Sequence, residues 1–386
     1  MKNVFDLDFE LKKIVLTGGP CAGKTTALSW IVNNFERSGW KVLTVNEAAT
    51  ELIKAGMGPC DFMSVLGFQE ALMRMQIFKE NMTEKNAAKL AKAVDPGKIL
   101  IVCDRGICDN HAYLSDGDYA KVLRRVRLTQ QKAFERYDAV FHLVTAADGA
   151  EEFYTLSNNE ARSEDVEQAR RLDHLTQNAW IGHPHLRVIR NEKGKTFEQK
   201  LQKLMAEIAV VLGEPEPLEI ERKFLVKCVD FEWISHRSDC QKVDILQTYL
   251  LSNKNEEVRV RQRGVLWDYT FTKTVKRNTG DPAKRVEIES RITHDEYLKL
   301  LMDADPKLRP IHKTRYCFLQ RINGQYFEID VYPGRGNYAI LEVEVPSKDA
   351  EIIFPDFLEV VREVTDDPRY RNREIAKHGG RLPKEV

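Results

Sequence analysis

The hydrophobic positions follow two different patterns in the two halves of the chain. In the first half, short and mainly apolar segments are separated by longer segments with helical spacing, which is typical of a parallel sheet with helices between its strands. These runs lie at residues 14–16, 41–45, 98–103, 138–144 and 186–189. From residue 218 onward, apolar and charged positions alternate with a period of two, as in antiparallel strands. The sequence therefore predicts an α/β domain followed by a β-rich domain.

A proline-rich segment lies where the pattern changes. Residues 198–212 have the spacing of an amphipathic helix, and residues 213–217 read Gly-Glu-Pro-Glu-Pro. Two prolines and a glycine stop a helix and favour an extended, fairly stiff connector. We therefore predict a first domain over residues 1–212, a linker over 213–217 and a second domain over 218–386.

The first apolar run leads into a glycine-rich turn. Residues 18–26 read Gly-Gly-Pro-Cys-Ala-Gly-Lys-Thr-Thr, and a helical pattern follows over 27–35. A strand, a G-x-x-x-x-G-K-[ST] turn and a helix form a P-loop, whose backbone N–H groups and helix N-terminus attract phosphate. Lys24 is expected to reach the β- and γ-phosphates and Thr25 to ligate Mg²⁺. The predicted nucleotide-binding residues are Gly18, Gly19, Gly23, Lys24, Thr25, Thr26 and Asp104. A chance match in a glycine-rich turn is the alternative.

Several further polar residues of the first half have two interpretations. Asp104 follows an apolar run, which is the Walker B position that holds Mg²⁺, but aspartate also caps helices and turns. Glu47 follows the second run and is either a base or substrate contact or a charge at a helix N-terminus. Three arginines between the fourth and fifth runs either close over phosphates as a lid or form a solvated helix face. These are Arg162, Arg170 and Arg171.

Charged residues recur, mostly at a spacing of two, on successive predicted strands of the second half. They are Glu219, Glu221 and Lys223; Arg259, Arg261 and Arg263; Lys273 and Lys276; Arg285 and Glu287; Lys313 and Arg315; Glu328 and Asp330; and Glu342 and Glu344. Each group alone is the ordinary solvated face of a strand. If the sheet closes into a barrel, the charges instead meet in a lumen, where they must be paired or bind ions. Salt bridges alone would satisfy them, or the bases hold a polyanion and the acids hold Mg²⁺ or Mn²⁺.

Composition narrows the class of protein. The 386 residues contain 59 Lys plus Arg and 59 Asp plus Glu, so the net charge is zero. This balance argues against a protein that coats nucleic acid or a membrane surface. Seven scattered cysteines show no zinc-site spacing and favour free thiols in a cytoplasmic protein. No signal peptide and no membrane-spanning run of apolar residues is expected.

Both halves resemble known families. The P-loop, Glu47, Asp104-Arg105-Gly106 and Gly182-His183-Pro184 make residues 12–212 similar to an AAA-type ATPase-like domain related to nicotinamide riboside kinases. Residues 218 to about 380 resemble the CYTH, or triphosphate tunnel metalloenzyme, family, whose Glu-x-Glu-x-Lys signature is Glu219, Glu221 and Lys223 here. This second resemblance implies an eight-stranded antiparallel β-barrel tunnel that binds triphosphates and metal.

The resemblance to the tunnel family also implies residue roles. The metal ligands would be Glu219, Glu221, Glu342 and Glu344, with Asp330 and Glu287 as further candidates. The catalytic bases that contact the phosphates would be Lys223, Arg259, Arg261, Lys273, Arg285, Lys313 and Arg315. Glu219 and Glu221 would also be catalytic residues, because they hold the metal. A metal-positioned water would then attack a phosphorus in line.

The leading functional prediction is an enzyme with two sites. The tunnel would hydrolyse an inorganic or nucleoside triphosphate with Mg²⁺ or Mn²⁺, and the P-loop domain would bind or hydrolyse ATP or GTP. One alternative is a nucleotide-binding regulator whose tunnel binds a phosphorylated lipid or protein partner. Another is a small-molecule kinase with an accessory tunnel phosphatase. A nucleotide-cyclising reaction, known among relatives of the tunnel family, also stays open.

Overall fold

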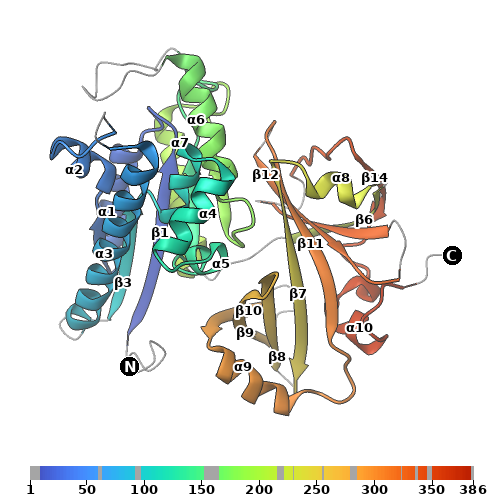
Figure 1. Ribbon diagram of the computed structural model, residues 1–386. Coiled ribbons are helices and arrows are strands. Elements are labelled where there is room, and N and C mark those ends of the chain that lie inside the picture. Colours follow the sequence, from blue (N-terminus) through green and yellow to red (C-terminus); the bar gives the residue numbers. More distant parts are fainter. Residues whose placement is uncertain are drawn as a thin grey trace. The chain divides into compact units, whose positions relative to one another are not determined.

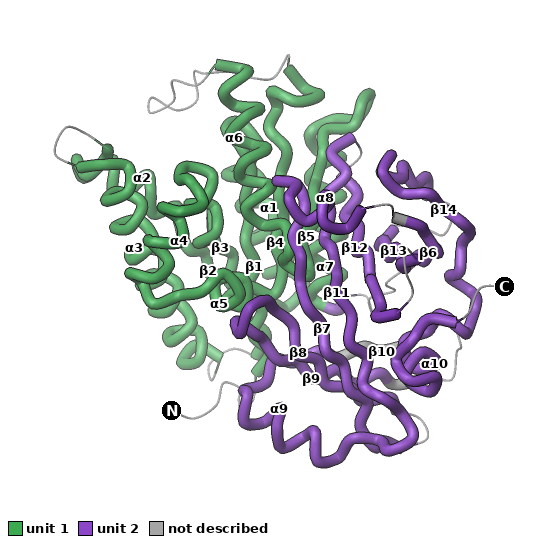
Figure 2. The backbone as a smooth tube through the Cα atoms, turned by 45° about the vertical axis from the view of Figure 1, so that its right-hand side comes forward, with its two compact units in different colours: residues 1–212 green, residues 213–386 purple. Residues whose placement is uncertain are grey.

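The computed structural model divides the chain into two compact units, residues 1–212 and 213–386. Figure 2 shows these units in green and purple. The structure describes residues 9–59, 63–91, 97–151, 165–214, 221–228, 230–253, 256–278, 285–322, 324–334, 338–345 and 350–383. Each unit has its own sheet and its own hydrophobic core, so the two are described separately.

The first unit is a five-stranded parallel sheet with the strand order β2-β3-β1-β4-β5. Its strands are β1 (Glu10–Gly18), β2 (Trp40–Val45), β3 (Lys98–Asp104), β4 (Ala139–Leu143) and β5 (Leu186–Ile189). Its helices are α1 (Lys24–Arg37), α2 (Ala48–Lys54), α3 (Val65–Leu90), η2 (Ile107–Tyr113), α4 (Asp116–Arg125), α5 (Gln130–Phe134), α6 (Val166–Asn178) and α7 (Phe197–Leu212). Figure 1 shows the helices arranged about this sheet. The α/β P-loop class expected for this half is therefore confirmed.

The core of the first unit explains why the apolar runs become strands. Every residue of β4 is buried, as are the last six residues of β1, so these central strands have an apolar layer on both faces. Helix α1 packs Ile31 and Phe35 against the sheet, and α7 adds Leu204 and Ile208 to the same cluster. Because all five strands are parallel, their carboxyl ends meet at one edge, where ligands bind in such sheets.

The second unit is a nine-stranded antiparallel sheet with the strand order β10-β9-β8-β7-β11-β12-β13-β6-β14. Its strands are β6 (Glu221–Cys228), β7 (Cys240–Leu250), β8 (Glu256–Val265), β9 (Asp268–Asn278), β10 (Arg285–Ile292), β11 (Ile311–Gln320), β12 (Gln325–Val331), β13 (Tyr338–Glu344) and β14 (Leu358–Glu363). Its helices are α8 (Phe231–Ser235), α9 (His294–Leu300), η4 (Leu301–Asp303), η5 (Pro368–Tyr370) and α10 (Asn372–Lys377).

This sheet differs from the expected eight-stranded barrel in one strand and in its pairing. Strands β6 to β13 are eight, and β14 adds a ninth by pairing with the outer edge of β6. Among the described residues, the end strands β10 and β14 do not pair with each other, so the hydrogen-bond order is that of an open sheet. The large antiparallel sheet is confirmed at that level.

The two faces of the second sheet have different chemistry. One face carries an apolar cluster that includes Phe318, Phe327 and Val343, together with Ile234 of α8. The opposite face carries the charged rows, and at one end of it Ile375 of α10 joins an apolar cluster with Ile311. Alternation with a period of two therefore separates apolar from charged side chains, as the sequence indicates. In the described part of the chain, no helix has the length and apolar character needed to cross a membrane.

Candidate functional site

Close packing explains the two motif glycines of the P-loop. Gly18 has φ of +146° and Gly23 has φ of +86°, a region that non-glycine residues rarely adopt. A Cβ at Gly18 would lie 2.1 Å from the Leu143 carbonyl oxygen, and one at Gly23 would lie 2.4 Å from the Phe197 ring. The loop therefore turns tightly between β1 and α1, and α1 starts at Lys24 with its N-terminus facing the turn.

A buried carboxylate on α6 fixes the start of the same loop. The Gly19 N–H donates to Asp173 Oδ1 at 2.7 Å, and the Thr145 N–H donates to the same oxygen at 3.1 Å. A Cβ at Gly19 would lie 2.7 Å from that oxygen, so only glycine fits there without displacement. Burial opposes ionisation of Asp173, yet His142 and the backbone donors lower its pKa. Nothing in the spacing of this helix singles out Asp173.

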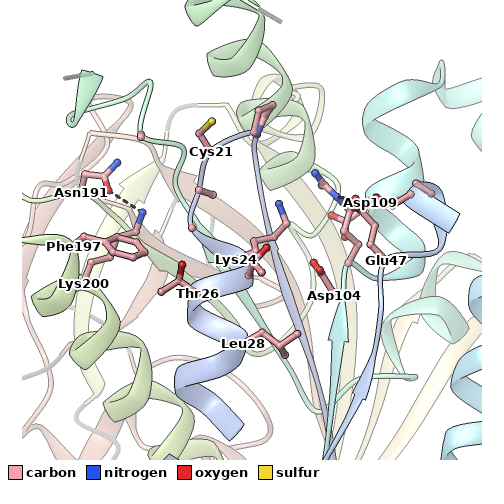
Figure 3. A pocket seen from close by; sticks show the side chains of 18 of the residues that line it. Cys21, Lys24, Thr26, Leu28, Glu47, Asp104, Asp109, Asn191, Phe197 and Lys200 are labelled. Atoms are coloured by element: carbon pink, nitrogen blue, oxygen red, sulfur yellow. Dashed lines mark hydrogen bonds and ion pairs between the residues drawn. The ribbon is translucent and has the colours of Figure 1, made fainter. Parts of the chain in front are cut away.

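A cavity of about 2310 Å³ opens at the P-loop. It exceeds the roughly 300–1000 Å³ of a typical small-molecule site, so it has room for a nucleotide and a second molecule. In Figure 3, Asn191, Phe197 and Lys200 lie on one side of Lys24, and Glu47, Asp104 and Asp109 lie on the other. The predicted residues Gly23, Lys24, Thr25, Thr26 and Asp104 all line this cavity. Gly18, at the end of β1, and Gly19, which follows it, are not among the described residues that line the cavity.

Asp104 fits the role of a magnesium ligand. Its side chain lines the cavity at the end of β3, and its buried Oδ1 has no hydrogen-bond partner among the residues that the structure describes. Burial raises the pKa of Asp104, with Lys24 acting in the opposite direction. A desolvated carboxylate oxygen beside the P-loop is what a divalent cation would satisfy, and Thr25 in the first turn of α1 supplies a hydroxyl.

Glu47 lines the cavity and is paired with a neighbouring arginine. Its Oε1 accepts from Arg105 Nε at 3.0 Å, and its Oε2 accepts from the Thr50 hydroxyl at 2.7 Å. Although burial acts against ionisation, the charges of Arg105 and Lys24 lower the pKa of Glu47 to about 2. The N-cap position of α2 holds this residue, but its side chain makes no capping hydrogen bond.

The cavity wall beyond Glu47 contains further unsatisfied polar atoms. Gln69 Oε1, Asn110 Oδ1 and Arg105 Nη1 are buried and, within the described residues, have no hydrogen-bond partner. All three residues line the cavity. The sequence analysis missed Gln69 and Asn110, because an isolated amide in a helix carries no motif.

Asp109 and the proposed lid arginines have other contacts. The Asp109 carboxylate accepts from the Thr17 hydroxyl, the Gly106 N–H and Trp180 Nε1, so it organises the start of η2. Arg170 donates to the Ala147 carbonyl oxygen at 2.6 Å and pairs with Glu151. Neither Arg170 nor the exposed Arg171 is among the described residues that line the cavity, and Arg162 lies outside the described part.

In the second unit, the strand register brings most of the predicted charged residues to one face. In the strand register, Arg315 lies opposite Asp330, and Glu342 lies opposite both Glu328 and Lys223. Directly opposed residues of antiparallel strands point to the same side. The charged face therefore contains Glu221, Lys223, Arg259, Arg261, Arg263, Lys313, Arg315, Glu328, Asp330, Glu342 and Glu344.

Arg315 holds the centre of this face together. Its guanidinium donates to Asp330 Oδ1 and Oδ2 at 2.7 Å each and to Glu342 Oε2 at 2.6 Å, and it also pairs with Glu328. Lys313, which is 1% exposed, pairs with the fully buried Asp330. Burial alone would lower the pKa of Arg315, but its three carboxylate partners raise it well above the usual value. The buried charges are thus paired, as their desolvation requires.

Lys223 lies between two of the predicted metal ligands. Its Nζ is 2.5 Å from Glu342 Oε1 and 3.1 Å from Glu221 Oε2. Burial and the nearby Glu342 charge raise the pKa of Glu221, whereas the charge of Lys223 moderates this effect. Glu344 is exposed at the end of β13 and opposes Glu221 across the strands.

Three arginines of β8 make the neighbouring part of the face basic. Arg259 and Arg263 are 8% and 7% exposed, and Arg261 donates from Nη2 to Gln247 Oε1 at 3.2 Å. Burial and the neighbouring Arg259 charge lower the pKa of Arg261. The Arg261 Nε has no hydrogen-bond partner within the described residues. This concentration of positive charge suits a polyanion.

The register separates Lys273 from this group. Lys273 opposes Val260 and therefore lies on the apolar face, whereas Lys276 opposes Glu257 on the charged face. In the sequence, a period of two is compatible with either lysine on the charged face. Thr272 opposes Arg261, so counting by two from Thr272 places Lys276 on that face. Glu219 lies outside the described residues, and so do the side chains of Arg285 and Glu287.

The acids of this face supply the hard oxygen ligands that Mg²⁺ and Mn²⁺ prefer. Within the described ranges, however, no group of three His, Cys, Asp or Glu side chains is arranged to hold a metal ion. Glu221 and Glu342 are the two carboxylates that share one cation, the Lys223 ammonium. The residue types fit a divalent metal at this point, together with Glu344 at the edge.

Comparisons with known proteins match both halves of the chain. The model of an AAA domain matches residues 13–199. An inorganic triphosphatase of Nitrosomonas europaea is 34% identical over 163 residues, which is 41% of this chain and 96% of that protein. An inorganic triphosphatase of Acetivibrio thermocellus is 34% identical over 161 residues, which is 42% of this chain and 94% of that protein. A crystal structure of an inorganic triphosphatase is 31% identical and covers 41% of this chain and 94% of that chain, with a TM-score of 0.30.

Proposed function

We propose that this chain hydrolyses a triphosphate on the charged face of its second unit. The premise is that the chain belongs to the CYTH-type family of inorganic triphosphatases and carries an AAA domain in residues 13–199. The chain is an enzyme of the phosphohydrolase class in this proposal. The substrate is inorganic triphosphate or a nucleoside triphosphate, and Mg²⁺ or Mn²⁺ is the cofactor. The first unit binds ATP or GTP at its P-loop. Dispersed cysteines favour a cytoplasmic location.

The observation that carries this proposal is the segregation of buried charge on one face of the sheet. Arginines of β8 concentrate positive charge on the same face as the carboxylates of β12 and β13, with β7 and β11 between these strands. A salt-bridged structural core would need its bases and acids to alternate, yet Arg261 has an arginine on each side along β8, and burial together with the charge of Arg259 lowers its pKa. A polyanion that binds there would relieve this repulsion.

The chemistry follows from the same arrangement. Arg259, Arg261 and Lys276 would hold the non-reacting phosphates and orient the chain of phosphorus atoms in line with the attacking water. Arg315 would stay with Asp330 and keep the guanidinium in place as negative charge builds on the transferred phosphoryl oxygens. The divalent metal, held by Glu221, Glu342 and Glu344 with Glu219, would lower the pKa of the water and neutralise the phosphates.

The closed tunnel remains part of this proposal. Enclosure would strengthen each of these electrostatic contacts by excluding water. We also propose that each reaction has its own domain. The domains are residues 1–212 and residues 218–386, joined by a linker over 213–217.

A second candidate function for the first unit is phosphoryl transfer to a small acceptor molecule. It is favoured by the cavity of about 2310 Å³ and by the unsatisfied Gln69 and Asn110 oxygens beyond the P-loop. Amide oxygens accept hydrogen bonds, so an acceptor with hydroxyl groups would satisfy them. Simple hydrolysis of a nucleotide would leave these groups without a ligand.

The test is orthophosphate release from tripolyphosphate by the intact chain with Mg²⁺ and with Mn²⁺. We expect release that depends on the metal and persists in a Lys24→Ala variant, because the P-loop does not take part. No metal-dependent release above the uncatalysed rate would overturn the proposal. Label from the γ-phosphate of ATP that appears on an organic acceptor, rather than in orthophosphate, would identify the second candidate activity.

A further inference from the structure

Lys223 occupies the place of a cation between two carboxylates that the proposed reaction assigns to a metal. The Nζ of Lys223 is 2.5 Å from Glu342 Oε1 and 3.1 Å from Glu221 Oε2. The second oxygen of Glu342 accepts from Arg315 Nη2 at 2.6 Å. Both oxygens of Glu342 therefore already have a positive partner before any metal arrives.

We propose that Lys223 is an exchangeable cation that holds Glu221 and Glu342 until the phosphates of the substrate draw it away, so that the divalent metal binds together with the triphosphate and not before it. This inference rests on the proposed function of the second unit. It concerns the order of binding, which the family relationship does not specify.

Because this ion pair has little exposure to solvent, the displacement of Lys223 and the binding of the metal depend strongly on each other. Lys223 and Glu342 are ion-pair partners with little exposure to solvent, since their side chains are 16% and 6% exposed. A metal that displaced Lys223 on its own would leave a desolvated ammonium without a counter-charge, which is costly. An incoming triphosphate provides that counter-charge, because its negative phosphates can accept from the ammonium.

The surrounding charges restrict where Lys223 can go. Two buried acids of the face, Glu328 and Asp330, are already paired with Arg315, and Asp330 is paired with Lys313 as well. Glu221, whose side chain is 38% exposed, already contacts Lys223, and Glu344 is exposed at the end of β13. A ligand can give Lys223 a new partner, and a polyanion on the arginines of the same face is the ligand of matching charge.

The direct test is the affinity of the intact chain for Mn²⁺ without nucleotide or phosphate, measured from the free Mn²⁺ signal in electron paramagnetic resonance. We expect Lys223→Met to bind Mn²⁺ at least about tenfold more tightly than the wild type, because the resident cation is gone. If Lys223 had a purely structural role, its replacement would weaken metal binding. Lys227→Met, on the same strand and paired with Glu359, is the matched control and should leave the affinity unchanged.

Two outcomes would overturn the inference. One is a Lys223→Met protein that binds Mn²⁺ no more tightly than the wild type. The other comes from calorimetry on a Lys24→Ala protein with an imido analogue of tripolyphosphate. By reciprocity, the analogue should bind about tenfold more tightly with Mn²⁺ than in EDTA, and equal affinities would contradict coupled binding. Metal-dependent hydrolysis with either of these outcomes would leave the proposed function intact.

Discussion

The two candidate sites prepare for phosphate in opposite ways. In the first unit, the groups that would meet the ligand are left unsatisfied, with Asp104 Oδ1 and Arg105 Nη1 buried and without a hydrogen-bond partner in the described residues. In the second unit, the acids of β12 and β13 are paired with bases, and Arg315 alone contacts three carboxylates, although Arg261 Nε has no hydrogen-bond partner in the described residues. The carboxylate of the first site is open for its ligand, whereas the carboxylates of the second are already neutralised.

This difference has a physical cause. The P-loop binds phosphate through backbone N–H groups and one lysine, so few ionised side chains need neutralising when the site is empty. The second site depends on many ionised side chains gathered on one buried face. Such charges must be paired in the absence of ligand, because isolated buried ions are too costly. Ligand binding should therefore rearrange ion pairs in the second unit far more than in the first.

The largest effect is expected from breaking the central ion pairs of the second unit. Arg315→Met would leave Asp330, Glu328 and Glu342 partly uncompensated, and we expect it to lower the free energy of unfolding by about 3–5 kcal/mol. Chemical denaturation monitored by circular dichroism measures this change. Arg369→Met, which removes an exposed partner of Asp367, should cost less than about 1 kcal/mol. Similar losses in both variants would remove the contrast between the two sites.

The paired carboxylate in the first unit gives a smaller and pH-dependent effect. The pKa of Glu47 falls from 4.5 to about 2 on folding, so its ionised form stabilises the folded state above pH 4.5. This contribution, roughly 2–3 kcal/mol, is lost as the pH falls from 4.5 toward 2. Glu47→Gln should therefore be less stable than the wild type at pH 7 and closer to it at pH 3. A difference that is the same at both pH values would show that the pairing with Arg105 does not carry this stability.

Removing the P-loop lysine should separate the two activities. Lys24→Ala should weaken binding of a fluorescent ATP or GTP analogue by about tenfold to a hundredfold, because a charged hydrogen bond to phosphate is lost. Tripolyphosphate hydrolysis should not change. A parallel loss of both activities would mean that the two sites are not independent.

The smallest expected effect tests which lysine of β9 belongs to the charged face. Lys276→Met should lower kcat/KM for tripolyphosphate by about tenfold, and Lys273→Met should leave it within about twofold. The reason is the register, which places Lys276 opposite Glu257 and Lys273 opposite Val260. The reverse result would show that the pattern in the sequence was the better guide to this strand.

Features of the fold and of the sites could be predicted where their sequence signal lies in one continuous segment, and not where they depend on contacts between distant segments. The P-loop and its flanking strand and helix are contiguous in sequence, so the motif alone located Lys24 and Thr25 correctly in the cavity. The face of β9 was not fixed locally, because a period of two allows either Lys273 or Lys276. Only the pairing of β9 with β8 decides between them.

The partners of the charged residues could not be predicted either. The sequence shows that Lys223, Glu221 and Glu342 belong to one charged face, but it does not show which of them are paired. That choice depends on the register of β6 against β13, strands that are more than a hundred residues apart. Similarly, Asp173 contacts Gly19 only because α6 packs beside the P-loop, a tertiary contact with no sequence signature.

The central claim is that the carboxylates of the second unit hold the metal for triphosphate hydrolysis. The most direct measurement is metal-dependent phosphate release from tripolyphosphate by the intact Glu342→Gln protein, with exposed Glu359→Gln as the matched control. Glu342→Gln should lower kcat by about a hundredfold or more while nucleotide binding at the P-loop stays normal. The control should hydrolyse tripolyphosphate like the wild type. A folded Glu342→Gln protein with undiminished, metal-dependent release would contradict the account.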